Sequence, residues 1–147
     1  MVDNAGVPLS LTPLMIAHSS LTLDLPDEAA TDALGQALAM VAAELSPNTA
    51  GVLTPGPEAQ GRIHLQGELG AGKTALVRAF LRHCSISGRI KSPSYALLES
   101  YEVSNLYLYH LDFYRFSDPA EWLDAGFRDL FKNQALILMA FVELNTF

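Results

Sequence analysis

A glycine-rich run between a predicted strand and a predicted helix is the feature that most constrains this chain of 147 residues. The run reads Gly67-Glu68-Leu69-Gly70-Ala71-Gly72-Lys73-Thr74. It directly follows residues 62–66, which we expect to form a strand, and a helix is predicted over residues 73–83. The order of strand, loop and helix is the context in which such a run binds phosphate. The sequence therefore predicts an α/β domain with a phosphate-binding loop, or P-loop.

The residue types in this run suit the binding of a nucleoside triphosphate. Its glycines leave room for the backbone to wrap around an anion, and the turned backbone presents several N–H groups inward. The following helix adds the positive end of its dipole. Lys73 can reach the β- and γ-phosphates as a point charge, and the Thr74 hydroxyl is placed to ligate magnesium. The alternative is a Gly-rich turn that merely caps a helix, but the flanking strand and helix favour phosphate binding.

Composition and charge argue against two other classes of function. The formal charge is −7, and the basic residues are scattered instead of forming the stripe that is typical of nucleic-acid binders. Arg78, Arg82, Arg89 and Lys91 can form a modest patch, for which a solvated helix face is the simpler interpretation. The longest apolar run, residues 135–142, is too short to span a bilayer. We therefore expect no strong direct binding of RNA and no membrane association.

The rest of the sequence predicts strands and helices that suit one such domain. Residues 21–25 alternate apolar and polar side chains, which is typical of a strand. A helix is predicted from residue 27 to about residue 45, because proline and acidic residues stand at its start. Residues 46–61 are rich in Pro, Gly, Thr and Ala and predict a surface loop. Farther along we expect β-rich stretches at 95–103 and 106–111, a helical region opening at Asp118, and a last strand at 135–142.

Together these elements predict a three-layer P-loop NTPase domain. Its sheet is expected to be mostly parallel, with an antiparallel portion near residues 95–111 and helices on both faces. We expect residues 1–20 to be a flexible N-terminal extension and residues 21–147 to be a single domain, incomplete at the C-terminus. The single cysteine, Cys84, is compatible with a reducing cytoplasm, where we expect the protein to reside.

Two further segments carry candidate catalytic groups. The run Ser92-Pro93-Ser94-Tyr95 puts hydroxyls on a chain stiffened by proline, as a loop that senses a γ-phosphate needs, although such a run taken alone is more often an ordinary turn. Asp112 lies in a run of strand-forming residues and is able to reach magnesium directly or through water. Its alternative role is to pair with Arg115 or to cap a turn. His110 nearby is more readily interpreted as structural.

The order of several motifs resembles one family, TsaE (also called YjeE). They are Leu25-Pro26-Asp27-Glu28, Lys91-Ser92-Pro93-Ser94-Tyr95, Tyr109-His110-Leu111-Asp112-Phe113-Tyr114-Arg115, Asp118-Pro119-Ala120-Glu121-Trp122 and Gly126-Phe127-Arg128-Asp129. That family is the bacterial ATPase needed to make threonylcarbamoyladenosine in tRNA. The resemblance implies binding of ATP and Mg²⁺, with Ser94 in a switch-like segment. It also implies that the segment Pro26-Asp27-Glu28, Asp27 in particular, lies near the adenine, although a plain helix cap explains the same residues. It also implies action on a complex of the partner proteins TsaB and TsaD, and contact with tRNA only indirectly.

The C-terminal part of the chain departs from the family pattern. After Phe131 the family continues into a strand that ends in Glu-Trp, and Ala140 and Phe141 occupy those two places here. A carboxylate at that strand end would hold magnesium or orient the attacking water. Glu143 lies three residues later, and sliding it into place would disturb the alternation of the strand. Two functions therefore stay open, an ATPase of this type and a nucleotide-gated docking module with little or no hydrolysis.

Overall fold

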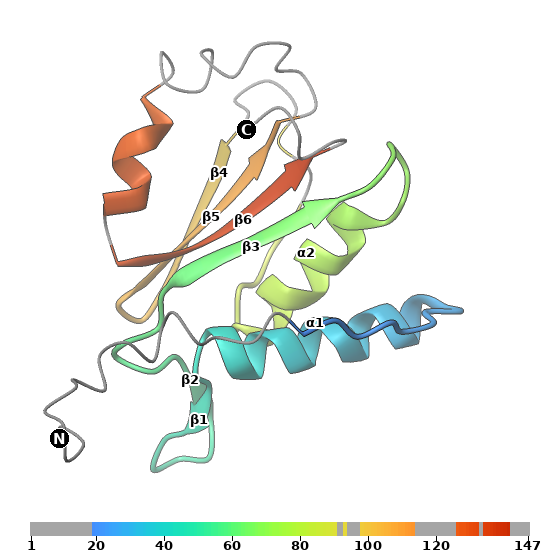
Figure 1. Cartoon of the computed structure of the whole chain (residues 1–147). Helices are drawn as coiled ribbons and strands as arrows, with labels where there is room; N and C mark the ends of the chain where they lie inside the picture. The colour runs from blue at the N-terminus through green and yellow to red at the C-terminus, as the bar shows by residue number, and fades with distance from the viewer. Residues whose placement is uncertain (1–18, 91–92, 94–97, 114–125, 133, 142–147) are drawn as a thin grey trace, which may run out of the picture.

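The computed structural model describes residues 19–90, 93, 98–113, 126–132 and 134–141. A four-stranded sheet has helices on one face and a short 3-10 helix on the other (Figure 1). The helices are α1 (Glu28–Ala42), α2 (Lys73–His83) and the 3-10 helix η2 (Phe127–Lys132). The sheet strands are β3 (Gly61–Gln66), β4 (Leu98–Val103), β5 (Leu106–Asp112) and β6 (Ala135–Phe141). A separate small hairpin joins β1 (Ser46–Pro47) to β2 (Leu53–Thr54).

The strand order explains why β6 is the most apolar segment of the chain. The order is β3-β6-β5-β4, in which β6 pairs in parallel with both β3 and β5, while β4 pairs antiparallel with β5. A central parallel strand is covered on both faces, so every residue of it has to be suitable for burial. All 7 residues of β6 are buried. The predicted α/β class, with its mostly parallel sheet and its antiparallel portion, is confirmed.

Two hydrophobic clusters hold the layers together, one on each face of the sheet. On the α2 face, Val77, Phe80 and Leu81 pack with the side chains of β5 and β6 whose residue numbers are even, such as Leu108 and Leu138. On the opposite face, the intervening side chains of the same strands pack with Phe127 of η2. This alternation assigns a face to every residue of the sheet, which matters for the polar groups at its C-terminal edge.

Helix α1 lies against α2 and not against the sheet, as Figure 1 shows. The two helices approach most closely at Gly35, where an added Cβ would lie 2.5 Å from the Cβ of Ala79. The N-terminus of α1 is capped by Asp27, whose Oδ1 accepts a hydrogen bond from the N–H of Ala30 at 2.8 Å. In the described residues, no helix is long and apolar enough to cross a membrane.

Several sequence predictions need correction. Residues 21–25 form no strand, and all five are exposed, because alternation alone does not supply the backbone partner that a strand requires. The first helix ends at Ala42 and not near residue 45, since Glu44 takes a φ of 50° and turns the chain. The predicted loop at 46–61 contains the β1–β2 hairpin. The helical region that we expected to open at Asp118 lies outside the described residues as far as residue 125, beyond which η2 is a 3-10 helix.

The close approach at Gly35 generates a stability prediction. Substituting Gly35→Ala should lower the free energy of unfolding by about 1–3 kcal/mol, because the new methyl group overlaps Ala79 and the backbone beside it. Gln36→Ala, at the exposed neighbouring position, should change it by less than about 0.5 kcal/mol. Chemical denaturation measures both. A Gly35→Ala variant more stable than the parent, as helix propensity alone would give, would contradict this packing.

Candidate functional site

The loop between β3 and α2 forms the compact turn that a phosphate-binding loop requires. The N–H of Gly67 donates to the carbonyl of Phe141 at 3.1 Å, which ties the start of the loop to the end of β6. The N–H of Ala71 donates to the carbonyl of Glu68 at 3.0 Å and closes the turn. Gly70 and Gly72 have φ values of 82° and 99°, which a residue with a side chain adopts only with strain. The predicted arrangement of strand, loop and helix is confirmed.

The start of α2 is chemically suited to an anion. Gly72 is the N-cap residue and has no side chain to satisfy the first N–H groups of the helix. These N–H groups and the helix dipole together favour a bound negative charge. The Nζ of Lys73 donates to the carbonyl of Gly67 and, at 2.9 Å, to that of Glu68. The ammonium group is therefore held against the loop itself, where a phosphate can replace the two carbonyls as its partner.

The β5 strand brings Asp112 to the same edge of the sheet as the loop. Asp112 is the last residue of β5 and is 8% exposed. Since Leu106 and Leu108 pack against α2, the alternation along β5 puts Asp112 on that face too. Thr74 and Asp112 both offer oxygen ligands, which Mg²⁺ prefers. The described residues contain no group of three or more His, Cys, Asp or Glu that could hold a metal by itself. Oxygen groups such as these two would fit a magnesium ion that also binds phosphate oxygens.

Ala140 lies directly beside Asp112 on this edge. Parallel pairing aligns it with Asp112 on one side and with Leu65 on the other. The side chain of Ala140 is 2% exposed and supplies no carboxylate. Phe141 points to the opposite face, where its ring stacks on that of Phe113 with a centroid distance of 5.1 Å. Ala140 therefore occupies the place on the α2 face where a glutamate would reach toward the loop.

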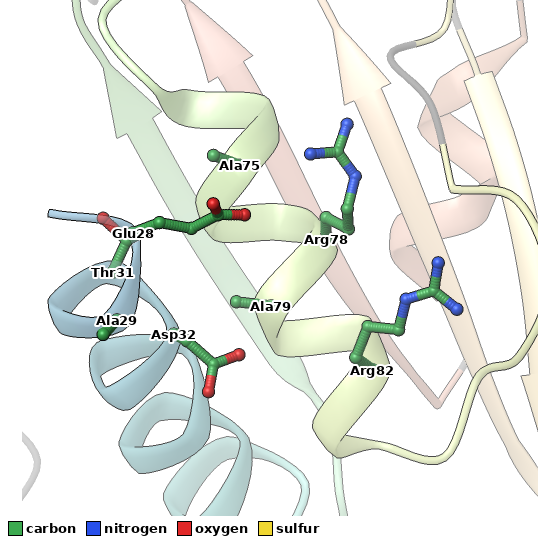
Figure 2. Close-up of a pocket in the computed structure, with 8 residues that line it drawn as sticks. All are labelled: Glu28, Ala29, Thr31, Asp32, Ala75, Arg78, Ala79 and Arg82. Atoms are coloured by element: carbon green, nitrogen blue, oxygen red, sulfur yellow. The ribbon is translucent and has the colours of Figure 1, made fainter.

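A groove between α1 and α2 adjoins the start of the P-loop helix. It encloses about 480 Å³ and is lined by Glu28, Ala29, Thr31 and Asp32 of α1 and by Ala75, Arg78, Ala79 and Arg82 of α2. Figure 2 shows that Ala75 and Ala79 face α1 and that Glu28 reaches toward α2, while the guanidinium groups of Arg78 and Arg82 point away from α1. Farther along the helices, Asp32 pairs with His83 at 3.1 Å. Small side chains thus form the floor of the groove, and a carboxylate stands at its entrance.

Sequence reasoning missed most of this groove. It singled out Asp27, whose carboxylate is instead occupied in capping α1, whereas the adjacent Glu28 lines the groove. It interpreted Arg78 and Arg82 as a solvated helix face, and both are indeed exposed. Arg78 also has a structural contact, since its Nε donates to the carbonyl of Ile90 at 3.2 Å. The sequence offered one signal for the groove, namely pairs of charged residues four positions apart on each helix. These pairs are Glu28 with Asp32 and Arg78 with Arg82.

One predicted functional residue, Ser94, lies outside the described residues. It belongs to the segment predicted to sense the γ-phosphate. Pro93, between the two serines of that segment, is described and is fully buried. The role of Ser94 therefore stays a prediction. Glu143, which the sequence did not favour as a replacement for the family's glutamate, also lies outside the described residues.

A buried histidine lies next to the site. His110 stands two residues before Asp112 on β5 and is 1% exposed. Neither its Nδ1 nor its Nε2 has a hydrogen-bond partner in the part of the chain that the structure describes. Burial lowers the pKa of His110 to about 4, although the nearby charge of Asp112 acts in the opposite direction. The ring is therefore neutral near pH 7.

Comparison with known proteins assigns the chain to a family. The profile of the family described as "Threonylcarbamoyl adenosine biosynthesis protein TsaE" matches residues 25–146. The chain belongs to the TsaE family. This TsaE-family chain is 35% identical over 124 residues to the tRNA threonylcarbamoyladenosine biosynthesis protein TsaE of Haemophilus influenzae, which covers 84% of the chain and 72% of that protein. The resemblance found in the sequence motifs is confirmed.

Other TsaE relatives match over shorter stretches. The protein of the same name from Synechocystis is 40% identical over 98 residues, 67% of this chain and 53% of that protein. For Rickettsia felis the identity is 41% over 83 residues, 56% of this chain and 48% of the relative. The chain thus spans about half the length of these two relatives. The crystal structure of Bacillus subtilis YdiB shares the fold, with a TM-score of 0.55, 21% identity and coverage of 83% of this chain and 68% of that one.

Proposed function

We propose that this TsaE-family chain binds magnesium-ATP in its P-loop and works in the threonylcarbamoyladenosine modification of tRNA. One observation carries the nucleotide proposal: Lys73, the uncapped start of α2 and Asp112 lie at the same edge of the sheet. The pathway follows from membership of a family named for this biosynthesis and from relatives of the same name. By the same resemblance, the chain acts on a complex of TsaB- and TsaD-type proteins and meets tRNA only through them.

In this proposal, different groups of the loop and of β5 contact different parts of the magnesium–triphosphate complex. The backbone N–H groups at the start of α2 donate to phosphate oxygens, and Lys73 neutralises part of their charge. The Thr74 hydroxyl and the Asp112 carboxylate hold the magnesium ion, which when bound would neutralise charge on the β- and γ-phosphates. In this account Asp112 and Ser94 are the catalytic residues, Ser94 being the one that senses the γ-phosphate.

The groove between α1 and α2 is the proposed site for the nucleoside. It begins one residue after Thr74, so a nucleotide held by the loop can extend into it without crossing a helix. Its small-residue floor accommodates a flat ring, and the Glu28 carboxylate can accept a hydrogen bond from an exocyclic amine such as that of adenine. Asp27 contributes indirectly, by fixing the start of the helix that carries Glu28.

Two activities remain compatible with this binding site. The first is ATP hydrolysis that resets the partner complex. The second is a nucleotide-gated docking module that changes its partner contacts on binding ATP and turns over little or none. Ala140 supports the second, because the family resemblance implies a glutamate at this position to orient the attacking water, and alanine has no carboxylate. The two activities thus differ in whether the bound ATP is hydrolysed, and both require binding of magnesium-ATP.

Binding and turnover of magnesium-ATP test this proposal. The parent chain should bind magnesium-ATP, and Lys73→Ala should weaken that binding by at least roughly tenfold. If Ala140 accounts for weak hydrolysis, the variant Ala140→Glu with Phe141→Trp should raise turnover above that of the parent. Calorimetry measures binding, and release of inorganic phosphate measures turnover.

A matched variant tests whether any gain in turnover comes from the carboxylate at position 140 or only from the larger side chain. Ala140→Gln with Phe141→Trp adds the same bulk without a carboxylate, so it should leave turnover at the parent level. Rapid turnover by the parent chain would rule out the docking-module alternative and show that another carboxylate does this work. If the folded parent chain does not bind magnesium-ATP, both candidate functions are wrong.

The groove makes a prediction that distinguishes the nucleoside from the phosphates. Ala75→Leu fills the groove near its entrance and should weaken ATP binding roughly tenfold, while binding of inorganic triphosphate should stay within about twofold. Competition calorimetry with the two ligands measures this difference. An equal loss for ATP and triphosphate would show that the substitution disturbs the loop, and no loss for either would place the nucleoside elsewhere.

A further inference from the structure

The buried ring of His110 has two nitrogen atoms that lack hydrogen-bond partners among the described residues. The residue lies on the α2 face of β5, is 1% exposed and has no hydrogen-bond partner for either nitrogen within the described part of the chain. Buried polar groups in folded proteins nearly always have such a partner, because leaving one unsatisfied costs free energy. Among the described residues, such a ring gains a hydrogen-bond partner only when a nearby acceptor changes its position.

The described residues next to His110 on this face of the sheet include few groups that could accept a hydrogen bond from its ring. Leu138 of β6 and Glu99 of β4 are its direct neighbours across the strands, and Asp112 is the next residue of β5 on the same face. Burial, the larger effect, lowers the pKa of the imidazole, and the charge of Asp112 acts in the opposite direction, which agrees with the two side chains lying near each other. Asp112 itself already takes part in an interaction in this structure, and a hydrogen bond from His110 would form in addition to it or in its place.

We propose that His110 is a positioning residue for Asp112, donating its ring N–H to that carboxylate when the magnesium–nucleotide complex is bound. The inference rests on the proposed function of Asp112 as a magnesium ligand. Carboxylates that hold metal ions are themselves commonly oriented by hydrogen bonds from neighbouring groups. A neutral imidazole has one N–H donor and so can serve one carboxylate in this way. Binding of the ligand would then satisfy a group that is unsatisfied without it.

This arrangement predicts effects of opposite sign on stability and on binding. Without ligand, His110→Leu replaces an unsatisfied ring by an apolar side chain of similar size, so the unfolding midpoint should rise by about 2–4 °C. The same substitution should weaken binding of a non-hydrolysable ATP analogue in magnesium roughly five- to tenfold. In EDTA, without magnesium, the affinity for the analogue should not change. Thermal unfolding of the unliganded protein and calorimetry of the analogue give the readouts.

Two matched variants complete the experiment. His110→Gln keeps a donor at the same place and should retain most of the magnesium-dependent affinity. His64→Leu makes the same substitution at an exposed position of β3 whose side chain faces away from α2, and it should leave binding unchanged. Glu99→Gln should also leave the magnesium-dependent part unchanged, because Glu99 is not the proposed partner.

The outcomes separate this inference from the function on which it rests. If His110→Leu lowers the unfolding midpoint, the ring is already satisfied in the unliganded protein and the inference is wrong. If the parent binds the analogue with magnesium but His110→Leu binds it equally well, or loses affinity equally in EDTA, the positioning role fails while the nucleotide site stands. If the parent binds no analogue at all, the proposed function fails and the inference fails with it.

Discussion

Parallel pairing of β6 with β3 on one side and β5 on the other is the constraint on which the candidate site depends. It brings the ends of three strands to one edge, and backbone hydrogen bonds fix that edge: Gly67 donates to Phe141 at 3.1 Å, and Phe113 donates to Ala140 at 2.9 Å. The P-loop thus starts from a strand held in register with the strand that ends in Asp112. In open α/β sheets, ligands bind at this edge, and the start of a helix directly beyond it adds favourable N–H groups.

The described residues at that edge of the sheet include few polar side chains. Ala140 stands between Leu65 and Asp112, so Asp112 is the one carboxylate among the described residues of this row. A glutamate at position 140 would be buried next to Asp112, and two adjacent carboxylates raise each other's pKa unless a cation lies between them. Alanine avoids this repulsion in the unliganded protein, and it also removes a group that could orient water. The two proposed activities therefore differ in what they require of the side chain at position 140.

The sequence predicted most of the helices and strands of the site, but it did not predict the tertiary contacts between them. The glycine-rich run and its flanking segments predicted β3, the loop and α2, because local backbone geometry determines that motif, and continuous apolar character predicted the buried strand β6. Residues 21–25 were wrongly predicted as a strand, since pairing depends on a distant partner. The groove depends on how closely α1 approaches α2 at Gly35 and Ala79, and the isolation of His110 depends on what surrounds it in three dimensions. The spacing of residues along each helix indicates which side chains share a face, but it does not predict how the helices approach each other or what surrounds His110.

The central claim is that the loop between β3 and α2 holds the phosphates of a nucleotide. A crystal structure of the chain with magnesium and a non-hydrolysable ATP analogue tests it most directly. The account predicts β- and γ-phosphate oxygens within hydrogen-bonding distance of the N–H groups of residues 70–74, with the Nζ of Lys73 moved from the carbonyls of Gly67 and Glu68 to the phosphates. A triphosphate bound elsewhere, with Lys73 still on those two carbonyls, would contradict it.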